Sequence, residues 1–363
     1  MTNAVITNID QVSTEWLTSV LKESGALTYG KVGSFELGTG QGNWSASANL
    51  LVKYTDNAKG LCPKRLFLKM VDTDLGDGET FGDSEVTYYT KDYIGLDNAP
   101  LLRCYNANYS KELGKYHLLL EDISETHTEA SEKGPTIGYG LALAEGLAVL
   151  HARWWGEARL AEAHALIHSA QHIQQFVEIA KPGVEHILQK FSQDLKPKWH
   201  QDLHEIFGNH PSAMIMRTSD QNGFTIIHGD VGCGNVLVPR RGERPIYIID
   251  RQPFNWSLTV WLGVYDLAYA IVLDWDIETR RQHEISILKQ YHAHLIKNDI
   301  LNYSWEQLYN DYRLCVVMCV YIATEYCRGG INEKWVHVWL PMLQRALTAC
   351  DDLDCYMIWR EKQ

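Results

Sequence analysis

Short apolar runs separated by turn residues fill the first part of the chain and are typical of β-strands. Such runs cover residues 32–37, 48–54 and 65–71, and glycine-rich or Asn/Asp/Gly turns lie between them. Before them, residues 14–24 have the apolar spacing of a short amphipathic helix, with Gly25 directly after it. The pattern predicts a helix followed by an antiparallel β-meander.

The spacing of apolar residues then changes to a helical period. SEVTYYTKDYIG has aromatic and apolar residues at helical spacing, and KYHLLLEDIS has the pattern of a last apolar strand that ends in two acids. From about residue 136 long helical patterns follow, and only residues 225–250 interrupt them with strands. We therefore expect an α+β fold with a small antiparallel β-sheet N-lobe, one connecting strand and a large, mainly helical C-lobe. The cleft between the lobes is the expected site.

Composition and charge are those of an ordinary globular protein. Of 363 residues, 45% are hydrophobic and 21% are charged. The formal net charge of −12 opposes binding to a phosphate backbone, so no nucleic-acid partner is expected. The N-terminus has no basic stretch followed by an apolar one, and no uncharged apolar run is long enough to span a bilayer. We expect a cytoplasmic protein without a membrane partner.

Eight cysteines are scattered along the chain without the paired spacing of a zinc site. Cys315 and Cys319 are four residues apart, which would suit half of a metal site, but a buried helix face explains them better. Cys233 lies in a glycine-containing loop, where a nucleophilic role would require a lowered thiol pKa. We expect reduced thiols that mostly fill the core.

The stretch IIHGDVGCGNVLV carries the strongest candidate chemistry. Its loop, residues 228–234, lies between two apolar runs, and Asp230 and Asn235 are five residues apart. A hairpin through PRRGERP would return a further strand that ends in Asp250, so the three side chains can meet at one end of a small sheet. Two carboxylates and an amide oxygen suit Mg²⁺, and one acid can instead accept a proton. Taken alone, Asp230 and Asn235 fit turn positions better.

HGDVGCGN followed by IID resembles the HGDxxxxN…ID pattern of the aminoglycoside phosphotransferase and choline kinase-like superfamily. The resemblance covers roughly residues 30–275 in order: FELGTGQGNWSASANLLVKY is similar to the first hairpin, LFLKM to the lysine strand, LLLEDIS to the hinge and VYDLAYAIV to the helix after the metal aspartate. The bacterial ecdysteroid kinase-like group is most similar. The resemblance implies a two-lobed protein-kinase-like fold, with a nucleotide-binding lobe at residues 1–120, a hinge at 121–124 and a catalytic and substrate-binding lobe at 125–363.

The resemblance also implies roles for the residues at matching positions. Asp230 would be the catalytic base for the acceptor hydroxyl, and Asn235 and Asp250 would hold Mg²⁺. Lys69 would reach the α- and β-phosphates of ATP, and Glu85 would pair with its ammonium group. ATP and Mg²⁺ are therefore the expected cofactors.

Supporting positions follow from the same resemblance. The hinge backbone near Glu121 and Ile123 would hydrogen-bond the adenine edge. His228 would brace the loop, and Asp266 in YDLAY would hold the C-lobe helix to it.

The glycine-rich segment GTGQGNWSAS is a further candidate for phosphate contact, through Gly40 and through Ser45 or Ser47. Its glycine spacing fits GxG but not GxGxxG, and no helix follows. The segment therefore matches neither a dinucleotide-binding motif nor a P-loop. A plain hairpin turn explains the segment equally well.

Aromatic and acidic residues after Asp250 are candidates for the acceptor site. Asp274, Trp275 and Glu325 could receive a cationic hydroxyl compound by cation–π and charge attraction. Packing between helices explains any single tryptophan better. An apolar, sterol-like alcohol stays open, because the kinases that the chain resembles include such substrates.

We interpret the chain as an ATP- and Mg-dependent O-phosphotransferase, a small-molecule kinase for an aminoglycoside-, choline- or sterol-like alcohol, acting as a monomer or homodimer. The alternative is a nucleotide-binding sensor or regulatory protein with a kinase-like fold and no transfer activity, although a pure binder does not need the base. A metal-dependent hydrolase would leave Lys69 and Glu85 without a purpose.

Overall fold

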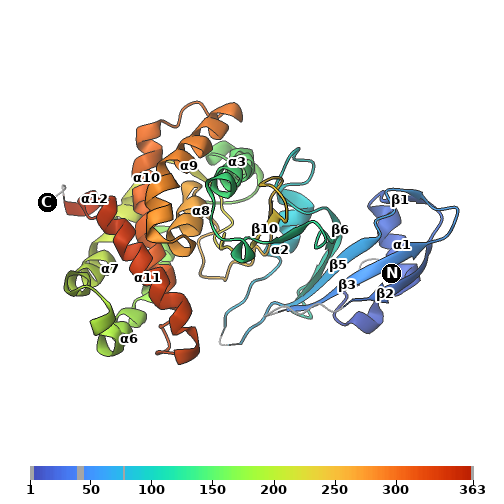
Figure 1. The fold of residues 1–363 in the computed structure, drawn as a ribbon, viewed down its shortest axis with the longest axis horizontal. Coiled ribbons are helices and arrows are strands. Elements are labelled where there is room, and N and C mark those ends of the chain that lie inside the picture. Colours follow the sequence, from blue (N-terminus) through green and yellow to red (C-terminus); the bar gives the residue numbers. More distant parts are fainter. Residues whose placement is uncertain (1–3, 39–44, 77, 361–363) are drawn as a thin grey trace.

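The structure is a computed structural model that describes residues 4–38, 45–76 and 78–360. A β-sheet with helix α1 (Thr14–Glu23) makes up one end of the elongated molecule, and a group of helices makes up the other (Figure 1). The C-terminus lies at the far end of the helical part (Figure 1). No described helix has the length and apolar character needed to cross a bilayer.

A five-stranded antiparallel sheet forms the N-lobe, with strand order β2-β3-β5-β7-β6. Strands β1 and β4 form a separate pair. The strands of this lobe are β1 (Leu27–Tyr29), β2 (Val32–Leu37), β3 (Ser45–Tyr54), β4 (Lys59–Gly60), β5 (Arg65–Asp72), β6 (Cys104–Ser110) and β7 (Lys115–Glu121). Between β5 and β6, helix α2 (Ser84–Thr87) continues as a π-helical turn, Tyr88–Asp92.

The C-lobe consists of helices and two small sheets, one with the order β11-β10-β8 and the other made of β12 and β9. Its strands are β8 (His127–Glu129), β9 (Phe224–Ile226), β10 (Val236–Pro239), β11 (Tyr247–Ile248) and β12 (Val260–Leu262). Its helices are α3 (Ile137–Arg153), α4 (Glu157–Glu162), α5 (Ala170–Ala180), α6 (Pro182–Phe191), α7 (Pro197–Arg217), α8 (Val264–Ala268), α9 (Ile277–Lys297), α10 (Trp305–Glu325), α11 (Val336–Asp352) and α12 (Met357–Arg360).

Strand alternation gives the N-lobe sheet two buried faces. Leu66 and Leu68 of β5 pack with helix α1, whose N-cap Ser13 accepts a hydrogen bond from the backbone N–H of Trp16 at 3.1 Å. Lys69, between Leu68 and Met70, therefore points to the opposite face of the sheet. That face turns toward the C-lobe.

Strand β7 contributes to the cores on both sides of this sheet. Leu119 belongs to the cluster beneath α1, whereas Leu118 and Leu120 belong to the cluster that continues into the C-lobe helices. Strand β7 is therefore buried on both faces, whereas a half-buried strand would alternate between buried and exposed side chains.

The long predicted elements are confirmed, including the helix at 14–24 and the strands within 32–37, 48–54 and 65–71. The α+β class with a small antiparallel sheet and a large helical part is also confirmed. The sequence pattern missed β6, β8 and β12, which are short or carry polar residues. The sequence pattern also did not indicate which strands pair with the two strands that flank the loop at residues 228–234. These strands, β9 and β10, belong to different sheets.

All eight cysteines are free thiols. Cys315 and Cys319 lie fully buried in α10, as a core helix face requires. Among the described residues, no group of three or more His, Cys, Asp and Glu side chains is arranged to hold a metal ion.

Candidate active site

Lys69 lies at the centre of an ion-pair network on the C-lobe face of β5. Its Nζ is 2.9 Å and 2.8 Å from the two carboxylate oxygens of Glu85, and it also contacts Oδ1 of Asp250. Burial by itself would lower the pKa of Lys69, but the two carboxylates outweigh burial and raise the pKa above its ordinary value. Lys69 is therefore a fixed cation, held by one carboxylate from each lobe.

Glu85 is held from its other side by Tyr116 and Gln252. The Tyr116 hydroxyl donates to Oε2 of Glu85, and Nε2 of Gln252 donates to the Tyr116 hydroxyl at 2.6 Å and to Glu85 at 3.3 Å. Gln252 comes from the C-lobe, two residues after Asp250. The buried carboxylate of Glu85 is thus satisfied by partners from both lobes.

Asp266, at the start of α8, anchors the loop at residues 228–234. Its carboxylate accepts the backbone N–H of His228 at 2.8 Å and that of Gly229 at 2.9 Å, and Nε2 of His151 lies 3.1 Å away. Burial would raise the pKa of Asp266, but the hydrogen bonds from His151 and Gly229 bring it below its ordinary value. An ionised Asp266 therefore fixes the entry to the loop.

His228 braces the same loop through both ring nitrogens. Nε2 lies 2.9 Å from the carbonyl oxygen of Ile249, and Nδ1 accepts the backbone N–H of Asp230 at 3.3 Å. A carbonyl only accepts and an amide N–H only donates, so the ring carries its proton on Nε2. Burial lowers the pKa of His228. The ring is therefore neutral at pH 7 and serves as a support.

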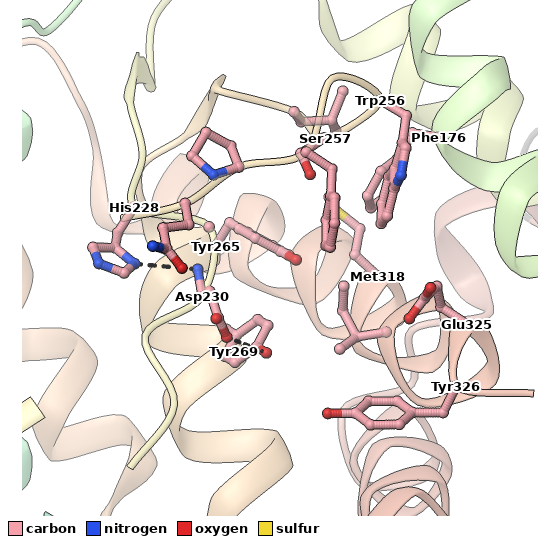
Figure 2. A pocket seen from close by; sticks show the side chains of 16 residues that line it. Phe176, His228, Asp230, Trp256, Ser257, Tyr265, Tyr269, Met318, Glu325 and Tyr326 are labelled. Atoms are coloured by element: carbon pink, nitrogen blue, oxygen red, sulfur yellow. Dashed lines mark hydrogen bonds between the residues drawn. The ribbon is translucent and has the colours of Figure 1, made fainter. Parts of the chain in front are cut away.

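The Asp230 carboxylate is positioned by two donors. The Tyr269 hydroxyl donates to Oδ1 at 2.6 Å (Figure 2). Nδ2 of Asn235 donates to Oδ2 at 3.0 Å and to the Asp230 carbonyl at 2.8 Å. Tyr269 follows Asp266 by three residues on the same helical segment. One helix face therefore holds both the loop backbone and the carboxylate.

The loop at residues 228–234 contributes to the lining of two cavities. The first, of about 400 Å³ and called here the inter-lobe cavity, is lined by Lys69, Glu85, Asp250, the 121–124 segment and Gly234. The second, of about 190 Å³ and called the aromatic cavity, is lined by the first half of the loop and by residues of the C-lobe. Its side chains include Asp230, Phe176, Phe254, Trp256, Tyr265, Tyr269, Met318, Glu325 and Tyr326.

Figure 2 shows the arrangement of the aromatic cavity. Asp230 and Tyr269 lie on one side, and Glu325 and Tyr326 lie on the opposite side, on the end of α10 (Figure 2). Apart from the neutral His228, none of the described residues that line this cavity is basic. The cavity therefore places two carboxylates among aromatic and aliphatic walls.

The sequence matches the model of the ecdysteroid kinase-like family over residues 87–302, which is more than half of the chain. The chain belongs to this family. The matched segment contains Asp230, Asn235 and Asp250 but begins after Lys69 and Glu85. No curated protein matches the sequence of this ecdysteroid kinase-like protein.

Solved structures share the fold of this ecdysteroid kinase-like protein at low sequence identity. Choline kinase from Cryptosporidium parvum Iowa II is 10% identical, with a TM-score of 0.57 over 95% of this chain and 98% of that chain. Plasmodium vivax ethanolamine kinase is 12% identical, with a TM-score of 0.53 over 100% and 93%. The GDP complex of aminoglycoside 2'-phosphotransferase-IIIa is 12% identical, with a TM-score of 0.52 over 94% and 100%.

Two expected acceptor residues of this ecdysteroid kinase-like protein do not line the aromatic cavity. Trp275 is 2% exposed and packs between α3 and α9, where a Cβ added at Gly140 would lie 2.7 Å from its ring. Asp274 lies behind the loop and accepts the backbone N–H of Cys233 at 2.6 Å. Neither Asp274 nor Trp275 is among the residues that line the aromatic cavity, so an acceptor contact of either side chain stays a prediction that this cavity does not support. Glu325 does line the cavity.

Other expectations for the site fall outside the described residues or are not supported by the geometry. Gly40 lies outside the described residues. Ser45 is the first residue of β3 and pairs with Val71, but the structure does not describe its side chain. Ser47 lines the inter-lobe cavity. Burial raises the pKa of the Cys233 thiol to about 12, which is the reverse of what a nucleophile requires.

The donors at Asn235 and Asp250 fit a magnesium ion held together with a nucleotide. Mg²⁺ in such sites takes one or two protein oxygens, and substrate phosphates and water complete its shell. The Asp250 carboxylate is 42% exposed, and no described group donates to the side-chain oxygen of Asn235. The backbone N–H of Ile249 donates to the Asn235 carbonyl at 3.0 Å, which brings the two side chains to one sheet end.

Tyr269 is a functional candidate that the sequence reasoning missed, although its spacing from Asp266 could have indicated it. Tyr269→Phe removes one of the two donors to Asp230. For the transfer reaction proposed below, we expect kcat to fall about tenfold while the Kd for the nucleotide stays unchanged, because the carboxylate loses its fixed orientation. Steady-state kinetics and calorimetry measure the two quantities. Tyr265→Phe is the control, since Tyr265 lines the same cavity without bonding Asp230; equal losses in both variants would contradict the role.

Asp274 gives the ecdysteroid kinase-like fold a pH-dependent stability. Burial raises its pKa from 3.8 to about 6. A raised folded-state pKa stabilises the protein below pH 4, and this contribution is lost as the pH rises through 6. Asp274→Asn keeps an oxygen for the Cys233 N–H and carries no charge. We therefore expect the variant to match wild type near pH 4 and to exceed it by about 1–3 kcal/mol at pH 8 in denaturant unfolding.

The control for this prediction is Asp276→Asn. Asp276 is the exposed N-cap of α9, its pKa is lowered by its hydrogen bonds to Thr279, and asparagine caps helices equally well. A gain at pH 8 in Asp276→Asn as large as that in Asp274→Asn would refute the assignment.

Proposed function

We propose that this protein is an ATP- and Mg-dependent small-molecule kinase that transfers the γ-phosphate to a hydroxyl group. One observation carries the proposal: a single loop lines two cavities with different chemistry. Asp230 lines the aromatic cavity, whereas Gly234, four residues later, lines the inter-lobe cavity beside Lys69 and Asp250. A hydroxyl in the first cavity and a phosphate chain in the second would meet at this loop.

The Asp230 carboxylate is suited to act as the base. Oδ2 and Oδ1 accept from Asn235 and Tyr269, which hold the carboxylate in one orientation. In the proposed reaction, the acceptor O–H gives its proton to Asp230 as the oxygen forms a bond to the γ-phosphorus. The bond from the γ-phosphorus to the bridging oxygen breaks, and ADP leaves with that oxygen. Neutral His228 and ionised Asp266 keep the loop in place.

The inter-lobe cavity is suited to the nucleotide. Lys69 would orient the phosphates, and Asn235 and Asp250 would hold magnesium, which supplies charge neutralisation when bound. The carbonyl of Ile123 already accepts the N–H groups of Thr126 and His127 at 2.9 Å each, whereas no described group accepts the N–H of Ile123 itself. That N–H is suited to the adenine edge. A nucleotide is present in the aminoglycoside 2'-phosphotransferase-IIIa structure, which was determined as a GDP complex.

The aromatic cavity favours a neutral or cationic acceptor. Its charged lining groups are the carboxylates of Asp230 and Glu325, which would repel an anion. Its walls of aromatic and aliphatic side chains would bury an apolar body or stack against a cationic group. An alcohol of the choline, aminoglycoside or sterol type therefore fits the cavity better than a phosphorylated or carboxylated compound.

A coupled ADP-release assay tests the proposal. Mg·ATP is offered with a panel of aminoglycosides, choline-like amines, sugars and hydrophobic alcohols, and wild type is compared with Asp230→Ala. Acceptor-dependent ADP release that disappears in the variant is the expected result. Binding of Mg·ATP by calorimetry without any release would favour a nucleotide-binding sensor. Absence of both binding and release would overturn the proposal.

A further inference from the structure

A short N-lobe segment reaches the wall of the aromatic cavity. Residues 78–81, called here the clasp, lie between β5 and α2, and the backbone N–H of Phe81 donates to the carbonyl of Thr73 at 3.1 Å. The clasp is therefore tied to the end of β5. On its other side it contacts the C-lobe segment at 254–256, which follows Asp250 and lines the aromatic cavity.

Backbone and ring contacts join the clasp to this segment. The N–H of Asn255 donates to the carbonyl of Thr80 at 3.0 Å, and its side-chain amide donates to the carbonyl of Gly78 at 3.0 Å. The rings of Phe81 and Phe254 lie 4.8 Å apart, and Phe254 stacks on Trp256 at 5.1 Å. An aromatic stack thus runs from the N-lobe into the cavity wall.

Glu79 makes the polar contacts of the clasp. Its Oε1 accepts the indole N–H of Trp256 at 2.9 Å, and Arg328 donates from Nη2 to Oε2 at 2.7 Å. An indole has one donor, so this bond fixes the orientation of the Trp256 ring. The Arg328 guanidinium also lies over that ring, 5.7 Å from its centre. Glu79 therefore bonds both Trp256 and Arg328 and holds the two side chains against each other.

Arg328 links Glu79 to the carboxylate of Glu325. Its Nε lies 3.2 Å from Oε1 of Glu325, which lines the aromatic cavity opposite Asp230. Burial raises the pKa of Glu325, and Arg328 opposes that effect. The position and charge of Glu325 thus depend on an arginine that the N-lobe holds from its other side.

We propose that Glu79 is a positioning residue of the acceptor site, through which the N-lobe completes the Trp256, Arg328 and Glu325 wall of the aromatic cavity. The inference rests on the proposed function for the identity of that site. It adds that acceptor affinity depends on the contact between the lobes, although Glu79 does not itself line the cavity. Removal of Glu79 should therefore affect acceptor binding and leave nucleotide binding and the chemical step intact.

Two readouts test this role in the full-length protein. Glu79→Gln is expected to raise the acceptor KM about tenfold, with kcat and the KM for ATP within about twofold of wild type. The acceptor is the most active compound of the ADP-release panel. Hydrogen exchange needs no acceptor: the amides of residues 255–257 should exchange about tenfold faster in the variant, while those of β7 stay unchanged.

Arg328→Met removes the same contact from the C-lobe side and should reproduce both shifts. Glu36→Gln is the matched control, because Glu36 is an exposed N-lobe carboxylate whose partner among the described residues is Lys53. An unchanged acceptor KM in Glu79→Gln, an equal rise in the KM for ATP, or unchanged exchange at residues 255–257 would each overturn the role. If wild type releases no ADP with any alcohol, the kinase proposal fails, and the exchange readout alone decides whether Glu79 positions this wall.

Discussion

Asp230→Asn is expected to lower kcat for phosphate transfer about a thousandfold and to leave the Kd for Mg·ATP within about twofold. Asparagine has the size of aspartate and can still accept the Tyr269 hydroxyl, but it cannot take the proton of the acceptor. The loop geometry should persist, because its anchors are His228 and Asp266 and not the carboxylate. Rapid-quench measurement of ADP formation at saturating acceptor gives kcat, and titration calorimetry gives the Kd.

The matched control for Asp230→Asn is Asp220→Asn, a surface carboxylate that lies outside both cavities. It should retain wild-type kinetics. A loss of Mg·ATP binding in Asp230→Asn would move Asp230 from base to structural support. Residual activity above one tenth of wild type would exclude it as the base.

Asp250→Ala is expected to weaken binding of Mg·ATP about 10- to 100-fold and to lower kcat by a further factor of about a hundred. The substitution removes the carboxylate assigned to magnesium and also one of the two partners of Lys69. Lys69 keeps Glu85, so the fold should survive. Calorimetric titration with ATP at several magnesium concentrations separates the loss of metal affinity from the loss of nucleotide affinity.

Asp72→Ala provides the control for Asp250→Ala. Asp72 lies on the same strand as Lys69, but it is an exposed carboxylate paired with Lys115. This variant should bind Mg·ATP as wild type does. If Asp250→Ala showed an unchanged dependence on magnesium, the metal assignment of Asp250 would be wrong.

The parts of the site that could be predicted from sequence are those encoded by short segments. Lys69 is the single charge in the apolar stretch LFLKMV of β5, and alternation decides which face it occupies. Asp230 and Asn235 are five residues apart on one loop, and the hairpin through β10 and β11 brings Asp250 back beside them. In each case the geometry follows from a few bonds between sequence neighbours or from one strand pairing.

The parts that could not be predicted depend on which way a helix or loop faces after packing. Trp275 directly follows the helical segment that holds Tyr269, yet it is buried, because Gly140 has no side chain and leaves room for its ring. Nothing in the sequence near Glu79 indicates a partner, since Trp256 and Arg328 lie 177 and 249 residues further along the chain. Such contacts are set by how the two lobes meet.

Strand β7 is buried on both faces, and this has a consequence for how the lobes can move. Leu118 and Leu120 belong to the same continuous core as the C-lobe helices, so the sheet cannot swing away from them without exposing apolar surface to water. A wide separation of the lobes is therefore disfavoured, and only small displacements of the sheet keep Leu118 and Leu120 buried. The clasp at residues 78–81 adds a second contact between the lobes, through the rings of Phe81 and Phe254.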